Sequence, residues 1–272
     1  MIILSTATSR CAVDDEHGAR LASLQLGGHE VLVTGTGAHD PLRWGCYPMV
    51  PWAGRIRDAR VHLDDTDHFV TGVGSSGPHP LHGSVADRRW TATTAGTTRV
   101  RCQTDLGDRW PVAGSVLHEI TLEPDAVTCT LGLTAGDRGF PAQVGWHPWF
   151  PSTWTRHLGF RARYRRDAAI LPTGHLDPVA DAPLDASPLD DCFVGPRWAP
   201  RLLHADGTEL AITSDCTCWV VYDEPGHAVC IEPQSGPPDG VNLEPAPLPA
   251  GATMLRWMRI ALVRRGPSVT GE

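Results

Sequence analysis

The sequence lacks the features that assign a chain to a membrane or to several common enzyme classes. No apolar run approaches the length of a membrane-spanning helix, and the N-terminal MIILSTATSRCAVDDE has no basic region before its short apolar start, as a signal peptide would. The sequence has no G-x-S-x-G elbow, no Walker glycine-lysine loop and no H-E-x-x-H motif. Nucleophilic, phosphate-cradling and zinc-protease chemistry therefore have no support, and we expect a cytoplasmic protein.

Clustered positive charge is also missing. The formal net charge is -8, with 23 basic residues against 31 acidic ones. Nucleic acids and anionic membranes attract basic faces. We therefore expect no nucleic-acid partner and no membrane partner, and a small neutral ligand fits better. The sequence gives no indication of the oligomeric state.

The eight cysteines give little support to a disulfide framework, because they are scattered along a long chain that shows no secretory leader. We expect reduced thiols. Cys216 and Cys218 are separated by one residue, which predicts that both face the same side of a strand. No second pair stands at zinc spacing, so core packing is favoured over a metal site.

Short alternating segments dominate the chain and are broken by 28 glycines and 24 prolines. No segment of twelve residues without Pro or Gly has apolar residues at the period of a helix, so helices should be few and short. The pattern predicts an all-β fold with antiparallel sheets, in one domain over residues 1–272. Residues 114–135 predict two strands joined at Glu123–Ala126. Residues 171–200, rich in Pro, Asp and Ala, predict a long surface excursion that carries function.

Four stretches combine titratable groups with tight local geometry: VPWAGRIRDARV with Arg55, PHPLHGSV with His82, QVGWHPWF with His147, and AVCIEPQSGPPDG with Glu232. A solvated basic loop is the simpler interpretation of the first. A buried histidine bonded to a backbone carbonyl is an equal alternative for the third. Glu232 ends an apolar strand-like run, where a carboxylate is costly to bury without a purpose.

The histidines of the second stretch are better suited to proton transfer than to metal binding. His79 and His82 have the i, i+3 spacing of a helical metal pair, but Pro78 and Pro80 disfavour a helix there. Gly83 permits unusual backbone angles or close approach of a ligand. Two histidines and one glutamate form a natural acid–base set, since histidine titrates near neutrality and a carboxylate in an apolar pocket can act as a base.

Taken in order, PWAGRI (51–56), HPLHGSV (79–85), GWHPWF (145–150) and EPQSGPPD (232–239) resemble the signature of the aldose 1-epimerase, or galactose mutarotase, family. The similarity runs from about Ala19 to Val263, and residues 18–32 are similar to the family's first hairpin. No single motif is decisive, but the four motifs in this order and at this spacing together form a strong signal. The resemblance implies a large antiparallel β-sandwich whose cleft interconverts the α and β anomers of a free aldohexose such as galactose or glucose, without a cofactor or a metal.

The resemblance also implies roles for particular residues. Glu232 would remove the proton of the anomeric hydroxyl, His147 would protonate the ring oxygen, and His82 would assist or bind a neighbouring hydroxyl. Arg55 and Asp190 would bind sugar oxygens, although Asp191 stands next to Asp190. A tryptophan, Trp146 or Trp149, would stack on the apolar face of the sugar.

The chain also departs from the family pattern, and other functions stay open. Many galactose mutarotases have Asn before the second histidine and Ser-Tyr-Phe after it, whereas this chain has Trp146 and then Pro148-Trp149-Phe150. These differences leave the choice of sugar open. A hexose 6-phosphate mutarotase would need extra cations such as Arg57, Arg88 and Arg89. A non-catalytic sugar-binding module would not need the acid–base set, and a glycoside hydrolase would need two carboxylates, Glu232 with Asp190 or Asp191.

Overall fold

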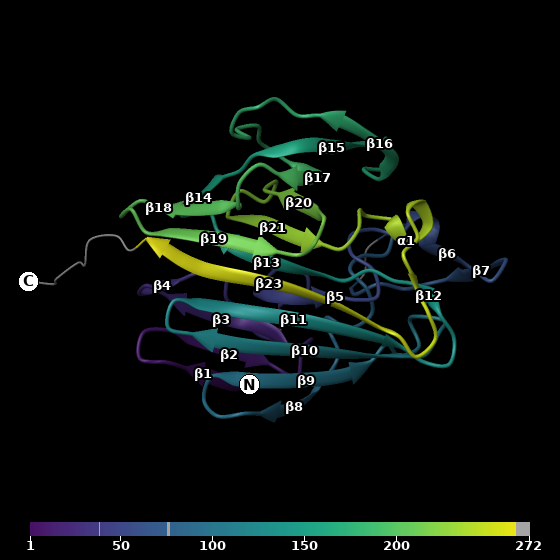
Figure 1. Ribbon diagram of the computed structural model, residues 1–272, viewed down its shortest axis with the longest axis horizontal. Coiled ribbons are helices and arrows are strands. Elements are labelled where there is room, and N and C mark those ends of the chain that lie inside the picture. Colours follow the sequence, from purple (N-terminus) through teal and green to yellow (C-terminus); the bar gives the residue numbers. More distant parts are fainter. Residues whose placement is uncertain (38, 75–76, 265–272) are drawn as a thin grey trace, which may run out of the picture.

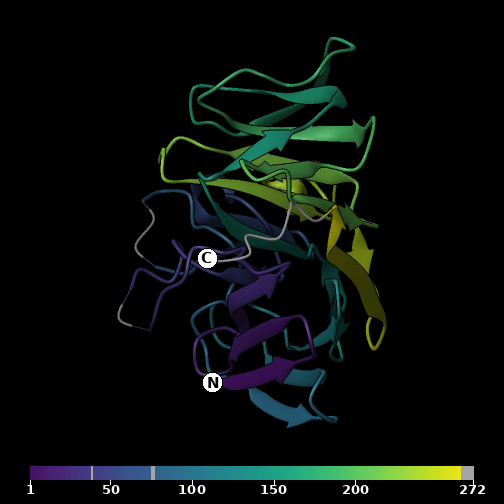
Figure 2. The ribbon, with the colours of Figure 1, turned by 90° about the vertical axis from the view of Figure 1, so that its left-hand side faces the viewer.

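The computed structural model describes residues 1–37, 39–74 and 77–264, and these form a two-layered β structure. The 11-stranded sheet pairs its strands in the order β1 (Ile2–Ser5), β2 (Arg10–Asp14), β3 (Arg20–Leu26), β5 (Cys46–Met49), β13 (Gly145–Pro151), β21 (Ala228–Gln234), β20 (Cys218–Tyr222), β17 (Asp190–Pro196), β15 (Phe160–Arg166) and β16 (Pro172–Pro178), and β4 (His29–Glu30) pairs with β3. Its two ends, β1 and β16, lie at opposite ends of the molecule (Figure 2).

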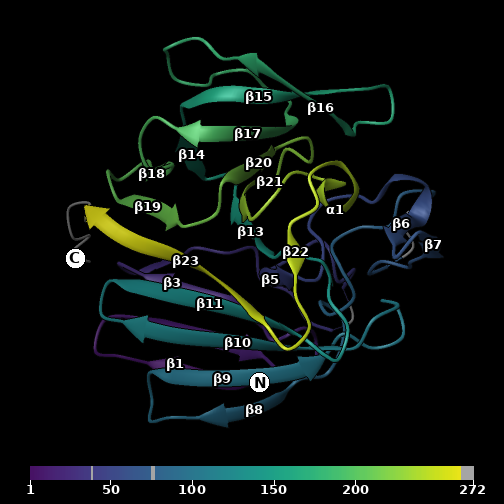
Figure 3. The same cartoon turned by 45° about the vertical axis from the view of Figure 1, so that its right-hand side comes forward.

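An 8-stranded sheet forms the second layer (Figure 1). Its order is β14 (Trp154–His157), β18 (Arg201–His204), β19 (Glu209–Ser214), β23 (Thr253–Arg264), β11 (Ala126–Ala135), β10 (Gly114–Glu123), β9 (Arg99–Asp105) and β8 (Thr91–Thr94). The remaining elements are the pair β12 (Phe140–Pro141) and β22 (Pro247–Leu248), the hairpin β6 (Arg60–Leu63) and β7 (Thr66–Phe69), the 3₁₀ turn η1 (Arg57–Ala59) and the helix α1 (Gly240–Leu243). Figure 3 shows β6, β7 and α1 together at one end.

Every strand pair among the described residues is antiparallel, and the predicted all-β class with few short helices is confirmed. The predicted hairpin is also confirmed, because Glu123 pairs with Ala126 across Pro124 and Asp125. Along β10, buried and more exposed residues alternate, as expected for a strand with one solvated face. No helix in the described part of the chain is long and apolar enough to cross a membrane.

One hydrophobic core lies between the two sheets. Side chains that are fully buried there come from both layers, such as Leu21 and Ile231 from the larger sheet and Ile120 and Ile260 from the smaller. Strand β21, AVCIEPQ, is buried along its whole length. Since alternate side chains of a strand point to opposite faces, the face of β21 turned away from this core must be covered by other groups. Those groups belong to the site described below.

Two expectations from the sequence need correction. Residues 171–200 are not one irregular excursion, because they supply β16 and β17 to an end of the larger sheet. The alternation of strand residues was hidden there by a high content of Pro and Asp. Cys216 and Cys218 are both buried but do not share a face. Cys216 precedes β20 and joins the core between the sheets, whereas Cys218 packs with Tyr164 and Val220 on the other side.

Candidate active site

A cavity of about 260 Å³ lies on the face of the larger sheet that is turned away from the second sheet. Side chains from five adjacent strands line it: Tyr47 of β5, His147 and Trp149 of β13, Glu232 and Gln234 of β21, Val220 and Tyr222 of β20, and Asp190 of β17. Loop residues Arg55, Leu81 and His82 close one side. The cavity is of a size suited to one small ligand and has several polar groups converging on it.

Strand register brings the central residues of the cavity together. Tyr47 stands opposite His147, and Val220 stands opposite Glu232. On β13 and β21, the pairs Gly145–Gln234 and Trp149–Cys230 flank His147 and Glu232 on either side, which places those two opposite each other. Directly opposed residues of an antiparallel pair have neighbouring side chains. A histidine and a glutamate that are 85 residues apart in sequence therefore meet because of sheet topology.

His147 and Glu232 form a buried acid–base pair. The Nε2 atom of His147 lies 3.2 Å from Oε1 of Glu232, and the two side chains are only 5% and 2% exposed. The other carboxylate oxygen of Glu232 accepts a hydrogen bond of 2.9 Å from the side-chain amide of Gln234. The imidazole of His147 stacks with the rings of Tyr47 and Trp149, at centroid distances of 4.9 and 5.3 Å. Stacking and hydrogen bonding thus fix both partners.

Burial changes the proton affinity of this pair in opposite directions. It raises the pKa of the Glu232 carboxyl well above its usual range, with a further increase from the negative charge of Asp190. It lowers the pKa of His147 well below the usual range, and nearby His82 adds to that effect. Low polarity disfavours the charged form of each group. The pair therefore keeps a single proton over a wide range of pH, and the state in which both side chains are neutral is favoured.

His82 approaches the same pair from a loop. Its ring meets that of His147 edge-on at a centroid distance of 4.9 Å. Burial, together with the positive charge of Arg55, lowers the pKa of His82 to about 3. Its buried Nδ1 has no hydrogen-bond partner within the described residues. A neutral imidazole with an unused polar atom beside a cavity is suited to hydrogen-bond a ligand.

The loop that carries His82 is held in an unusual backbone conformation. His82 has a φ of 57° and Gly83 a φ of 78°, both in the left-handed region. A Cβ at Gly83 would lie 2.0 Å from the carbonyl oxygen of Val50, so only glycine fits at this position. The backbone N–H of His82 donates to the carbonyl of Gly54, at 2.9 Å. This hydrogen bond links the loop that carries His82 to the loop that carries Arg55.

Arg55 and Asp190 form the polar end of the cavity. The guanidinium Nη1 of Arg55 lies 3.4 Å from Oδ2 of Asp190. Burial raises the pKa of Asp190, while the charge of Arg55 opposes that increase. Asp191 points to the opposite face of β17, where it pairs with Arg166 at 3.2 Å. Strand alternation therefore assigns the cavity to Asp190 and a structural ion pair to Asp191.

Comparison with known proteins agrees with the sequence signature. The family model described as Aldose 1-epimerase matches residues 2–260. The chain belongs to the aldose 1-epimerase family. This is a family of isomerases, and membership assigns the chain to that class of enzyme at a coarse level. No curated protein sequence is significantly similar to this chain.

Solved structures of aldose 1-epimerase relatives have the same fold. A galactose mutarotase-like protein from Clostridium acetobutylicum has a TM-score of 0.83 at 13% identity, covering 96% of this chain and 94% of that one. The galactose 1-epimerase of Lactobacillus acidophilus NCFM has a TM-score of 0.81 at 16% identity, covering 97% and 94%. A galactose mutarotase-like protein from Lactobacillus casei has a TM-score of 0.80 at 16% identity, covering 96% and 99%. At sequence identities this low, the similarity to these structures shows the fold alone.

Six residues were singled out from the sequence as candidates for the site. The structure brings five of them together in one cavity: Glu232, His147, His82, Arg55 and Asp190. The expectation for Trp146 is wrong. Its side chain is fully buried in the core between the sheets, and its Nε1 donates to His118 at 3.2 Å. Because strand residues alternate, Trp149 points into the cavity beside His147 and Trp146 points away.

Sequence reasoning missed three further cavity residues of this family member. Gln234 follows Glu232 by two positions and so shares its face of β21, a signal that was present in the sequence. Tyr47 reaches the cavity through the pairing of β5 with β13, which lies far away in sequence, whereas Tyr222 stands opposite Cys230 in the local β20–β21 pair. His79, the other histidine of the HPLHG motif, instead accepts a hydrogen bond from the backbone N–H of Asp58 at 3.0 Å. It shapes the loop.

Proposed function

We propose that this protein is an aldose 1-epimerase that interconverts the α and β anomers of a free aldohexose such as galactose or glucose. The single observation that carries the proposal is the buried pair of His147 and Glu232, whose Nε2 and Oε1 atoms lie 3.2 Å apart in a small cavity. Opening a hemiacetal requires one proton to be removed and one to be supplied. A pair that holds one proton between an acid and a base matches that requirement.

The short distance also defines how the sugar would lie. No ring fits between His147 and Glu232, so the sugar sits against the pair with its anomeric carbon next to both. That carbon carries the anomeric hydroxyl and the ring oxygen. Glu232 takes the hydroxyl proton, His147 donates a proton to the ring oxygen, and the bond between C1 and the ring oxygen breaks. Rotation about C1–C2 and return of both protons closes the ring as the other anomer.

Burial of the pair favours the intermediate of this reaction. When the ring is open, the proton has moved to Glu232 and His147 has given its proton away, so both side chains are neutral. The neutral state is the one that the raised pKa of Glu232 and the lowered pKa of His147 favour. The reaction therefore starts when the single proton of the pair lies on His147 and Glu232 is ionised, and proton transfer from and to the sugar returns the pair to its favoured neutral state. Each positioned acid or base contributes roughly 10²–10⁴-fold to the rate.

The other cavity residues bind the sugar in this proposal. Arg55 and Asp190 offer a donor and an acceptor to hydroxyl groups, and His82 offers a neutral imidazole at the ring oxygen or a neighbouring hydroxyl. Trp149 presents an aromatic ring beside His147. The sequence contains no lysine, so no side-chain amine can trap the open-chain aldehyde as a Schiff base.

A hexose 6-phosphate is less well supported as the substrate. The arginines that could have bound a phosphate lie outside the set of cavity residues, and each pairs with an acidic group: Arg57 with Asp167, Arg88 with Asp105, and Arg89 with Glu16. Arg43 does line the cavity, but it is paired with Asp40 at 3.3 Å and its side chain is 70% exposed. A free sugar fits this distribution of charge better.

A binding module without catalysis is also less well supported. Such a module has no use for a carboxyl group held at 2% exposure against an imidazole, an arrangement that costs folding free energy. A glycoside hydrolase would use Glu232 and Asp190 as a carboxylate pair. In that case the direct contact between Glu232 and His147 would have no role in the reaction.

The proposal is tested by the approach of fresh α-anomers to equilibrium, followed by polarimetry or by NMR exchange. Galactose, glucose and their 6-phosphates form the panel, and nitrophenyl glycosides test for hydrolysis. We expect faster exchange with at least one unphosphorylated sugar and no release of nitrophenol. Acceleration with the 6-phosphates alone would show that the substrate is phosphorylated. No acceleration with any sugar would contradict the proposed function.

A further inference from the structure

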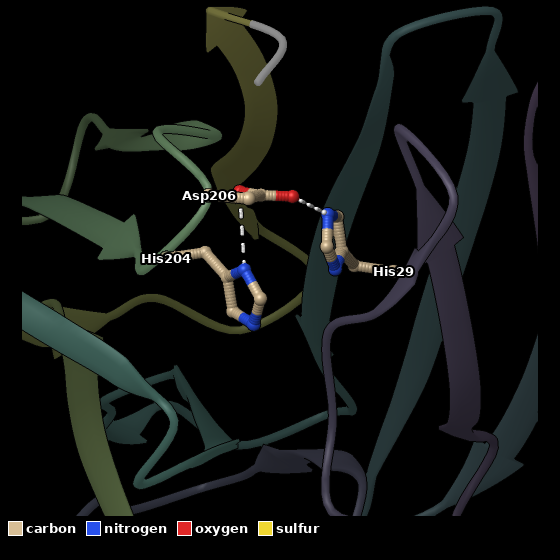
Figure 4. A group of neighbouring side chains, drawn as sticks. All are labelled: His29, His204 and Asp206. Atoms are coloured by element: carbon tan, nitrogen blue, oxygen red, sulfur yellow. Dashed lines mark ion pairs between the residues drawn. The ribbon is translucent and has the colours of Figure 1, made fainter. Parts of the chain in front are cut away.

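Two histidines and an aspartate converge outside the cavity, where β4 of the larger sheet approaches the β18–β19 turn of the smaller sheet (Figure 4). His29 lies in β4, which belongs to the larger sheet, whereas His204 ends β18 of the smaller sheet. Asp206 follows in the turn between β18 and β19. Figure 4 shows the carboxylate of Asp206 facing both imidazole rings. The acid–base mechanism uses none of these three residues.

The spacing of their ligand atoms suits a transition-metal ion. The Nε2 atom of His29 lies 2.9 Å from Oδ2 of Asp206, and the Nδ1 atom of His204 lies 3.1 Å from Oδ1. One ligand atom from each residue lies within 4.8 Å of the others. Around a tetrahedral zinc ion with bonds of about 2.1 Å, ligand atoms are separated by roughly 3.4 Å. The two His–Asp separations thus lie within about 0.5 Å of the value that a bound zinc ion would set.

The surroundings hold the three side chains in place and leave room for a further ligand. Trp154, which is 2% exposed, contacts both imidazoles, with ring-centroid distances of 5.5 Å to His29 and 5.1 Å to His204. The backbone N–H of Thr208 donates to Oδ1 of Asp206 at 2.8 Å, which orients the carboxylate. The side chains of His29, His204 and Asp206 are about a quarter exposed, so water can reach a fourth position.

A polar atom of this cluster also lacks a suitable partner. The Nδ1 atom of His204 is buried and makes no hydrogen bond of acceptable geometry within the described residues, although Asp206 is near it. An orphaned imidazole nitrogen that faces a second imidazole and a carboxylate is the arrangement that a metal ion satisfies. Two imidazoles and one carboxylate favour zinc and neighbouring divalent ions over calcium or magnesium.

We propose that His29, His204 and Asp206 bind a divalent transition-metal ion of the zinc class, which clamps the β3–β4 hairpin to the β18–β19 turn. The ion would then connect the two sheets. A second group with metal-ligand spacing, His147, Cys230 and Glu232, belongs to the proposed catalytic cavity. The experiment must therefore distinguish binding at His29, His204 and Asp206 from binding in the cavity.

The test is equilibrium dialysis of the metal-free full chain against zinc chloride, with the bound metal measured by mass spectrometry. We expect one ion per chain, and at least a hundredfold weaker binding in His204→Ala and Asp206→Asn. Glu232→Gln should bind zinc as the wild type does. His62→Ala is the matched control, because His62 is an exposed histidine that pairs with Asp67 at 3.2 Å without a second imidazole.

Two measurements on the wild-type chain do not depend on whether the variants fold. Cobalt(II) in place of zinc should give the strong visible absorption of a tetrahedral site with nitrogen and oxygen ligands. Zinc at about 100 times its dissociation constant should raise the melting temperature of this 272-residue chain by about 5 °C. If no zinc binds at micromolar concentration, contacts between histidine and aspartate alone explain the cluster. Loss of binding in Glu232→Gln alone would place the ion in the cavity. Either result would overturn the proposal.

Discussion

Replacing Glu232 by glutamine separates its role in proton transfer from its role in packing. The two side chains have the same shape, and in the variant the glutamine oxygen can still accept the hydrogen bond from Gln234. The glutamine nitrogen can donate to Nε2 of His147, which lies 3.2 Å from the carboxylate oxygen in the wild type. The substitution thus keeps both contacts and removes only the ability to accept a proton.

The expected losses and gains follow from burial. Loss of a positioned general base lowers the rate by roughly 10²–10⁴-fold, which corresponds to about 3–5 kcal/mol of activation free energy. Stability should not fall. A carboxyl group whose pKa is raised by folding stabilises the protein below its usual pKa, and this contribution is lost as the pH rises through the folded-state pKa. The glutamine never ionises, so its melting temperature should equal or exceed that of the wild type, with a gap that widens as the pH increases.

Two assays on the same preparations decide the matter. NMR exchange between anomers gives the rate, and circular dichroism between pH 6 and 9 gives the melting temperature. Glu123→Gln is the matched control, because Glu123 pairs with Arg259 at the edge of a surface turn and lies outside the cavity. If Glu232→Gln retained more than about a tenth of the wild-type rate, Glu232 would not be the base, whatever happened to the stability.

Three further predictions concern the same cavity. The profile of kcat/KM against pH should be flat from pH 5 to pH 8. The lowered pKa of His147 moves the acid limb to lower pH, and the raised pKa of Glu232 moves the alkaline limb to higher pH. An acid limb near pH 6.5 would contradict this prediction. Trp149→Ala should raise KM in a folded protein, whereas Trp146→Ala should lower the free energy of unfolding by about 3–5 kcal/mol in urea titrations. Arg55→Lys should raise KM by about tenfold, since an ammonium cannot reproduce the planar donors of a guanidinium; an unchanged KM would remove Arg55 from the binding site.

Much of the fold could be predicted because its strands carry their own signals. The β10–β11 hairpin has alternating residues on both sides of a two-residue turn, so its register follows from local sequence. The arrangement of the larger sheet could not be predicted from local patterns. Its central strands, β5, β13, β21, β20 and β17, come from four separate parts of the chain, and their order depends on packing between residues that are far apart in sequence.

The candidate site shows the same division. Glu232 and the HPLHG motif stand out locally, because a carboxylate in an apolar run and a histidine before a glycine are unusual. Their residue types suggested an acid–base set, but the contacts that assemble the site were not visible in local sequence, since Arg55 meets Asp190 across 135 positions and Tyr47 meets His147 across a strand pair. Trp146 was misassigned because composition ranks two neighbouring tryptophans equally, and only strand alternation separates them.

Trp146 also explains how the fold distinguishes a structural histidine from one suited to catalysis. Its Nε1 donates to Nε2 of His118, and Nδ1 of His118 donates to the carbonyl oxygen of Ala19 at 3.0 Å. Both ring nitrogens of His118 are thus used within the protein in one neutral tautomer, and burial lowers its pKa to about 4. His147, the next residue after Trp146, is equally buried but faces a cavity and a carboxylate. The hydrogen-bonded core histidine that could have been expected at His147 is therefore His118, whose bonds hold β13 against the second sheet and so fix the strand that carries His147.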